Sequence, residues 1–169
     1  MEIKNSVAIV SGGNRGIGEA FVREFIERDV KRVYVGTRSL DAAESLCREL
    51  GERAVAVQLD VTNDAEVAAV AAQCTDVNIV INNAGIHAGR TLIGADDMSA
   101  ARAEMAVNYF GVLSMCRAFA PALKNNGGGS IINILSAAGL VAVPNMGGYS
   151  PSKFAARALS TSVRAELAE

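Results

Sequence analysis

The chain has 169 residues, of which 50% are hydrophobic, and a formal net charge of −2. This length suits one domain with a substantial core but not two, and the charge balance gives no basic surface for nucleic acid or for a membrane. Residues 1–5 lack a signal-peptide profile and no apolar stretch approaches the length of a membrane span, so we expect a cytoplasmic protein. Cys47, Cys74 and Cys116 are scattered, without the spacing of a disulfide framework or a metal site.

The first predicted element is a buried strand over residues 6–11, followed by a glycine-rich loop and a helix start. Gly12, Gly16 and Gly18 are spaced Gly-x-x-x-Gly-x-Gly. Glycines so placed allow a tight turn, close approach of the backbone to a pyrophosphate and close helix packing. Three glycines could meet by accident in a chain that contains 16. The strand before them and the helical period after them favour an anion-binding loop at a helix N-terminus.

The rest of the chain alternates strands with helices, which predicts a parallel sheet covered by helices on both faces. One helix is predicted from Ser39, as its cap, to Leu50, with Gly51 as its stop, and another begins at the capping pair Asn63 and Glu66. The further strands are predicted over residues 32–36, 54–59, 77–82 and 130–135.

Two more helices complete the pattern. One is predicted from Asp96 to Asn125, with Pro121 bending or tightening its last turn. The other carries Tyr149 and Lys153, which are four residues apart and therefore share a face. The lysine ammonium can then approach the phenol oxygen and favour its ionised form, as a proton donor near neutral pH requires. Taken alone, the pair is more typical of two exposed neighbours on a helix than of a catalytic pair.

These motifs together resemble the short-chain dehydrogenase/reductase family from the first strand to the last residue. Besides the glycine loop and the Tyr/Lys pair, the chain carries Asp60-Val61-Thr62, Asn82-Asn83-Ala84-Gly85, Asn108 and Ser136 in the order of the family. The resemblance implies one Rossmann-like α/β domain over residues 1–169, a doubly wound parallel sheet that is incomplete at its C-terminal edge. It also implies a hydride transfer between nicotinamide and a small carbonyl or alcohol substrate, without a metal.

The resemblance implies a role for each motif. Tyr149 gives its proton to the substrate oxygen, Ser136 donates a hydrogen bond to the same oxygen, and Lys153 supports Tyr149 and holds the nicotinamide ribose. Asn108 orders a water that connects Lys153 to solvent. The segment Asp60-Val61-Thr62 binds the adenine, and the segment Asn82-Asn83-Ala84-Gly85 stabilises the sheet. Cofactor contacts are implied for Gly12, Asn14, Arg15, Gly16, Ile17, Gly18, Arg38, Asp60, Val61, Asn82, Ala84, Gly85, Tyr149 and Lys153.

The residues after the second strand predict the choice of cofactor. An acidic residue there would hold the ribose 2′-hydroxyl of NAD, but this chain has Arg38 at that position and Arg15 in the glycine loop. Guanidinium groups offer a fork of donors to a 2′-phosphate, which favours NADP as the cofactor. The alternative is that both arginines simply extend into solvent.

The resemblance also sets expectations for the C-terminal half. Family members usually continue beyond the Tyr/Lys helix with further strands, a Pro-Gly loop and a substrate lid, whereas this chain stops at Glu169. We therefore expect a fragment of a longer protein, or else a natural or designed short form. A homo-oligomer, either dimer or tetramer, is implied through the long helix near 100–125 and the Tyr/Lys helix near 150–168. One side of the Tyr/Lys helix carries Ala155, Leu159, Ser162 and Val163.

Three functional interpretations follow. The chain is an NADP-dependent carbonyl reductase or alcohol dehydrogenase, or a truncated NADP-binding module with little turnover, or a non-catalytic partner subunit. The intact set of Asn, Ser, Tyr and Lys disfavours the third. His87 is interpreted as a surface loop residue rather than a ligand or an acid. The loop between Ser136 and Tyr149 indicates an apolar substrate through Val141, Ala142, Val143, Asn145 and Met146.

Overall fold

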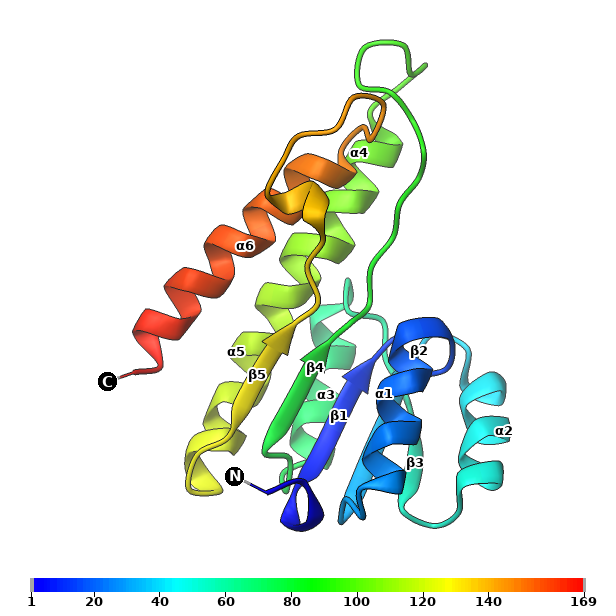
Figure 1. The fold of residues 1–169 in the computed structure, drawn as a ribbon, viewed down its shortest axis with the longest axis vertical. Coiled ribbons are helices and arrows are strands. Elements are labelled where there is room, and N and C mark those ends of the chain that lie inside the picture. The colour runs from blue at the N-terminus through cyan, green and yellow to red at the C-terminus, as the bar shows by residue number, and fades with distance from the viewer. Residues whose placement is uncertain (1, 169) are drawn as a thin grey trace.

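The computed structural model describes residues 2–168, in which five parallel strands form one sheet with the order β3-β2-β1-β4-β5 (Figure 1). The predicted fold class, a Rossmann-like doubly wound α/β sheet, is confirmed. Each strand lies close to its predicted bounds. The strands are β1 (Val7–Ser11), β2 (Arg32–Thr37), β3 (Ala54–Gln58), β4 (Ile79–Asn82) and β5 (Ser130–Asn133).

Helices cover both faces of the sheet, as the alternation of elements predicts. The core side chains show that α1 and α2 pack on one face and that α3 and α5 pack on the other (Figure 1). The main helices are α1 (Gly16–Glu27), α2 (Leu40–Leu50), α3 (Asp64–Gln73), α4 (Ser99–Met105), α5 (Val112–Asn125) and α6 (Tyr149–Glu166). Short helical turns are η1 (Ile3–Asn5), η2 (Ala106–Gly111) and η3 (Ala137–Gly139).

The central strand β1 shows why its sequence is apolar throughout. Side chains alternate between the two faces of a strand, and here both faces are covered. Val7 and Ile9 join the cluster that contains Phe119 of α5, whereas Ala8 and Val10 join the cluster on the opposite face. Each fully buried Val or Ile side chain contributes roughly 1.5–3 kcal/mol to folding. The strand therefore anchors the loop that follows it.

The two predicted helix caps have different outcomes. The side chain of Asn63 accepts hydrogen bonds from the backbone N–H groups of Ala65, at 3.1 Å, and Glu66, at 3.3 Å, so this cap is confirmed. Ser39 occupies the N-cap position of α2, but its side chain forms no capping hydrogen bond. Its backbone N–H instead donates to the hydroxyl of Thr37 at 3.1 Å, which closes a tight turn at the end of β2. The prediction that Ser39 caps through its side chain is wrong.

The predicted helix from Asp96 to Asn125 starts later than expected. The Asp97 carboxylate accepts a hydrogen bond from the backbone N–H of Ser99 at 2.7 Å, and α4 begins at Ser99. Pro121 lies inside α5, and the helix continues past it to Asn125.

The helix is also interrupted by the π-helical turn η2, which the sequence does not reveal. In a π-helical turn the backbone hydrogen bonds span five residues instead of four, and such turns often occur at functional sites. Gly111 of η2 packs against the loop after β3, where a Cβ would lie 2.7 Å from Cγ2 of Val61. Asn108 lies in the same turn and is fully buried.

Within residues 2–168 no helix combines the length and the apolar character that a membrane crossing requires.

Candidate active site

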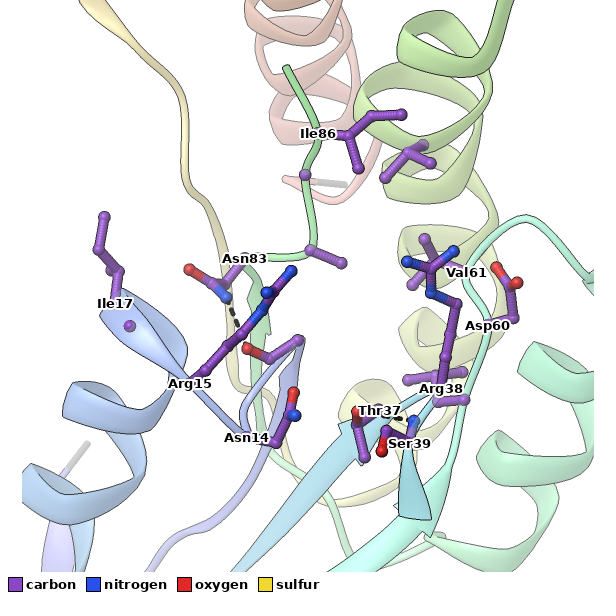
Figure 2. A pocket seen from close by; sticks show the side chains of 16 residues that line it. Asn14, Arg15, Ile17, Thr37, Arg38, Ser39, Asp60, Val61, Asn83 and Ile86 are labelled. Carbon is purple, nitrogen blue, oxygen red and sulfur yellow. Dashed lines mark hydrogen bonds between the residues drawn. The ribbon is translucent and has the colours of Figure 1, made fainter. Parts of the chain in front are cut away.

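A groove of about 660 Å³ runs across the carboxyl ends of β1, β2, β3 and β4 (Figure 2). The strand order reverses between β1 and β4, so the loops after these two strands diverge to opposite faces and leave a crevice. Parallel α/β sheets bind their ligands at such a switch point. The lining residues are Gly12, Asn14, Arg15, Gly16, Ile17, Thr37, Arg38, Ser39, Leu59, Asp60, Val61, Asn83, Ala84, Gly85, Ile86 and Val107.

The glycine loop brings its backbone close to the neighbouring strand. Gly12 has a φ of 64°, in the left-handed region that favours glycine. A Cβ on Gly18 would collide with the carbonyl oxygen of Gly12 and lie 2.5 Å from the side-chain nitrogen of Asn83. That nitrogen donates to the backbone carbonyls of Ser11 and Gly12, both at 3.1 Å. Helix α1 thus begins at the groove with its first N–H groups facing it, which fits the pyrophosphate of a dinucleotide.

Two arginines line the groove from different loops. Figure 2 shows Arg15 extending from the glycine loop and Arg38 from the end of β2. Within residues 2–168 neither guanidinium forms a salt bridge. Both charges are therefore available to an anionic group of a ligand in the groove. A cofactor whose adenosine half carries phosphate groups would offer such an anion.

Asp60 lines the groove on the side of Arg38 (Figure 2). Partial burial tends to raise the pKa of its carboxyl, but hydrogen bonds donated by the backbone and hydroxyl of Thr62, together with the charge of Arg38, lower the pKa below its ordinary value. The two bonds from Thr62 are 2.9 and 2.7 Å long. Asp60 is thus an ionised acceptor in a fixed orientation, suited to donor groups of a nucleoside.

The Tyr/Lys pair lies at the start of α6. Lys153 is only 6% exposed, and its Nζ donates to the backbone carbonyl of Ile134 at 2.9 Å. The same Nζ lies 5.8 Å from the ring centroid of Tyr149. Burial lowers the pKa of the Lys153 ammonium. The interpretation as an exposed helical pair is therefore wrong for Lys153, and the two side chains are neighbours as the spacing predicts.

Ser136 is held beside the same helix. It is the N-cap of η3, and its Oγ accepts a hydrogen bond from the backbone N–H of Ala138 at 3.1 Å. The hydroxyl of Ser150 in α6 donates to the carbonyl of Ala138 at 2.6 Å and fixes η3 against α6. Because the Ser136 oxygen accepts from the backbone, its own hydrogen can be donated to a substrate oxygen.

Asn108 connects the loop after β4 to α6. Its amide nitrogen donates to the carbonyl of Ile86 at 2.9 Å and to the hydroxyl of Ser152 at 3.0 Å, and its oxygen accepts from the N–H of Ile86 at 2.9 Å. Ser152 in turn donates to the backbone carbonyl of Tyr149 at 2.7 Å. Asn108 therefore has a direct structural role in addition to the predicted role of ordering a water.

Asn82 links neighbouring strands and does not face the groove. Its amide nitrogen donates to Asn133 at 2.8 Å and to the sulfur of Cys116 at 3.5 Å, and its side chain is buried between β4, β5 and α5. It does not line the groove, whereas the next residue, Asn83, does. The Asn82 side chain thus links strands, as the implied role in stabilising the sheet requires, whereas the predicted place of Asn82 beside the cofactor is taken by Asn83.

Other residues were missed or lie outside the groove. Gly18, Tyr149 and Lys153 were predicted to contact the cofactor, but they are not among the residues that line the groove. Five unpredicted lining residues lie at or just after the carboxyl end of a strand, a position that would have identified them: Thr37, Ser39, Leu59, Asn83 and Ile86. The sixth, Val107, lies in η2.

His87 is exposed in the loop after β4, as expected for a surface residue, but its ring centroid lies 4.8 Å from that of Tyr149. Within residues 2–168 no group of three His, Cys, Asp or Glu side chains is placed to hold a metal.

Comparison with known proteins decides the family. The model of the short chain dehydrogenase family matches residues 6–169. The chain belongs to this family. It is 33% identical over 99% of its length to dehydrogenase/reductase SDR family member 7B of Mus musculus, and 36% identical over 95% to a 3-alpha-(or 20-beta)-hydroxysteroid dehydrogenase of Mycobacterium bovis. It spans 54% and 63% of these two proteins, so about half to two thirds of the length of such relatives.

Solved structures of the family superpose closely on this chain. A short chain dehydrogenase from Burkholderia cenocepacia J2315 in complex with NADP has a TM-score of 0.93 and 45% identity, covering 99% of this chain and 69% of that one. A second family member, from Burkholderia phymatum in complex with NAD, has a TM-score of 0.90 and 30% identity, covering 96% and 60%. The short-chain dehydrogenase fold of this chain is thus one that holds a nicotinamide cofactor.

Proposed function

We propose that the protein is an NADP-dependent oxidoreductase that interconverts a small carbonyl compound and its alcohol. The observation that carries the proposal is the continuity between the groove and the Tyr/Lys helix. Ile86 lines the end of the groove, and Asn108 ties Ile86 to Ser152 of α6, one turn from Tyr149. The test is NADPH oxidation by the purified protein with a panel of apolar ketones and aldehydes.

Each residue of the site then has a chemical task. The nicotinamide, when bound, supplies hydride to the carbonyl carbon. The Tyr149 hydroxyl transfers its proton to the developing alkoxide oxygen, and Ser136 donates a hydrogen bond to that oxygen. Lys153 stabilises the negative charge left on Tyr149. Asn108 keeps the loop after β4 in place beside α6.

The choice of NADP rests on Arg38 and Arg15, because both residues line the groove and, within residues 2–168, neither guanidinium forms a salt bridge. A family member solved with NADP supports the proposal, although another was solved with NAD. We expect NADPH to bind more tightly than NADH by about one to two powers of ten, since charge-assisted hydrogen bonds to a 2′-phosphate contribute roughly 1.5–3 kcal/mol each before screening.

Replacing Arg38 tests this preference directly. Arg38→Asp is expected to reverse the order of affinities, because a carboxylate repels the 2′-phosphate and accepts from the 2′-hydroxyl of NADH. Nicotinamide fluorescence titration measures both affinities. Arg48→Asp, an equal change of charge on an exposed part of α2, is the matched control and should leave the ratio unchanged. Equal affinities of the unmodified protein for the two cofactors would contradict the proposal.

A second candidate function is an NADP-binding module with little turnover. It is favoured by the exposure of the apolar residues that follow Ser136, since Leu140 and Val141 are 60% and 67% exposed. The described residues thus build the cofactor side of the site more fully than the substrate side. Tight NADPH binding without oxidation in the presence of any carbonyl compound would identify this candidate.

We also propose self-association through α5 and α6. Ala155, Leu159 and Val163 are half-buried along one side of α6, and Phe154 on α6 is 38% exposed. Ile132 on the edge strand β5 is 42% exposed, and an exposed edge strand is a template for pairing with another chain. Residues 1–169 expressed alone are expected to form dimers or larger aggregates in light scattering. A monodisperse monomer would contradict this prediction.

A further inference from the structure

Glu104 is a buried carboxylate that the proposed chemistry does not use. It lies in α4, four residues before Asn108, and its side chain is only 1% exposed. Removing a charged group from water costs several kcal/mol unless hydrogen bonds or opposite charge compensate for it. The contacts of Glu104 therefore indicate what its burial achieves.

One carboxylate oxygen holds the loop after β4. Oε1 of Glu104 accepts a hydrogen bond from the backbone N–H of Ala88 at 2.7 Å. Asn108 holds Ile86 through both of its backbone polar groups, at 2.9 Å each. His87 lies between these two anchored residues, and its ring packs on Tyr149 with 4.8 Å between the ring centroids. Glu104 of α4 and Asn108 of η2 thus fix the loop on both sides of His87, whose ring packs on that of Tyr149.

The other oxygen faces the residue that precedes Tyr149. A Cβ added to Gly148 would lie 2.8 Å from Oε2 of Glu104 and 2.7 Å from Cα of Ala101. Gly148 is the N-cap of α6, so this oxygen lies at the N-terminus of the catalytic helix. The partial positive charge of a helix N-terminus favours a carboxylate there. The side-chain-free Gly148 allows the carboxylate to approach this closely.

We propose that Glu104 is a positioning residue that sets the place of Tyr149 by joining the Ala88 loop to the start of α6. Glu104 and Asn108 act as a pair, one helical turn apart, on the loop that carries His87. The role in turnover rests on the proposed reductase function, whereas the contact between loop and helix does not. A displacement of reacting groups by about 1 Å can lower a rate by about a hundredfold.

The test uses the full chain and the single histidine of the sequence as a reporter. We expect the ring of Tyr149, 4.8 Å away between centroids, to shift the NMR signal of the His87 imidazole, and this signal needs no assignment because His87 is the one histidine of the sequence. Glu104→Ala removes both contacts, and Glu104→Gln keeps an acceptor for Ala88. Glu49→Ala removes an exposed carboxylate that pairs with Arg23 far from the site, and serves as the matched control.

Glu104→Ala is expected to move the His87 signal towards that of a solvent-exposed histidine and to lower kcat by about ten- to a hundredfold, with NADPH affinity changed less than about threefold. Glu104→Gln should stay within about fivefold of the unmodified kcat, and Glu49→Ala should match the unmodified protein in both readouts. Gly148→Ala adds a methyl group that pushes on the Glu104 carboxylate from the side of α6. It should move the His87 signal and lower kcat in the same direction as Glu104→Ala, and it provides the test if Glu104→Ala fails to fold.

The two proposals fail in different ways. If the unmodified protein oxidises no NADPH with any carbonyl compound, the proposed function is wrong, and the His87 signal still decides the role of Glu104. An unchanged His87 signal in folded Glu104→Ala, or in Gly148→Ala, overturns the positioning role even if activity falls.

Discussion

Tyr149→Phe is expected to lower carbonyl reduction by roughly two to four powers of ten while the fold and NADPH binding persist. The substitution removes one hydroxyl and keeps the ring that packs on His87. The developing alkoxide then has no proton donor, although the hydrogen bond from Ser136 and the positioning of the substrate remain. This separation of chemistry from binding is the clearest signature of a general acid.

The measurement compares kcat and NADPH affinity in the same preparation. Tyr109→Phe is the control, because Tyr109 lies in η2 and packs on Phe110, with 4.9 Å between ring centroids, and has no part in the proposed chemistry. It should retain the unmodified kcat. Reduction of a confirmed substrate by Tyr149→Phe at the unmodified rate would show that another group supplies the proton.

Lys153→Met is expected to lower turnover at least as much as Tyr149→Phe, to weaken NADPH binding, and yet to stabilise the cofactor-free protein near neutral pH. Burial lowers the pKa of the Lys153 ammonium in the folded state, so the folded protein binds this proton less tightly than the unfolded chain does. The charged lysine therefore costs stability. Met has a similar length without the charge, and the lost hydrogen bond to Ile134 offsets part of the gain.

The sign of the pH dependence follows from the same linkage. Below the lowered pKa of the folded state the cost of the buried charge is fully present. As the pH rises from there to the ordinary pKa of lysine, the unmodified protein regains stability, and the advantage of Lys153→Met shrinks. Urea unfolding of both proteins at about pH 7 and about pH 10 measures this difference. A variant that is less stable than the parent at both values would contradict the argument.

The sequence predicts the sheet well because its signals are local. Strands such as β1 are apolar at every position, since both faces are covered, and the stretches between strands show helical periodicity. Asn63 could be recognised as a cap because its side chain bonds only to the next residues of its own helix. The glycine loop and the Tyr/Lys pair could also be recognised from the sequence, because each is defined by a spacing of residues that are close in the chain.

The errors concern features that depend on contacts distant in the sequence. Asn82 and Asn83 are adjacent and identical in type, yet one faces Asn133 between strands and the other faces Gly12. Only the three-dimensional register of β4 decides which of them reaches the groove. Serine is a residue type that often caps helices, but Ser39 forms its hydrogen bond to the Thr37 hydroxyl through its backbone N–H, and its own hydroxyl forms no capping bond.

The π-helical turn η2 has a consequence for how this helix can diverge among relatives. A residue in an α-helix turns by about 100°, so one residue inserted or deleted normally rotates everything beyond it out of register. Here η2 lies between α4, which carries Glu104, and α5, which carries Met115 and Phe119 in the core. Because a π-helical turn holds one residue more than an α-helical turn, the faces that α4 and α5 present are already offset from those of one continuous α-helix. A change of one residue within η2 would re-aim the half of the helix beside α6 while the half that packs on the sheet kept its place.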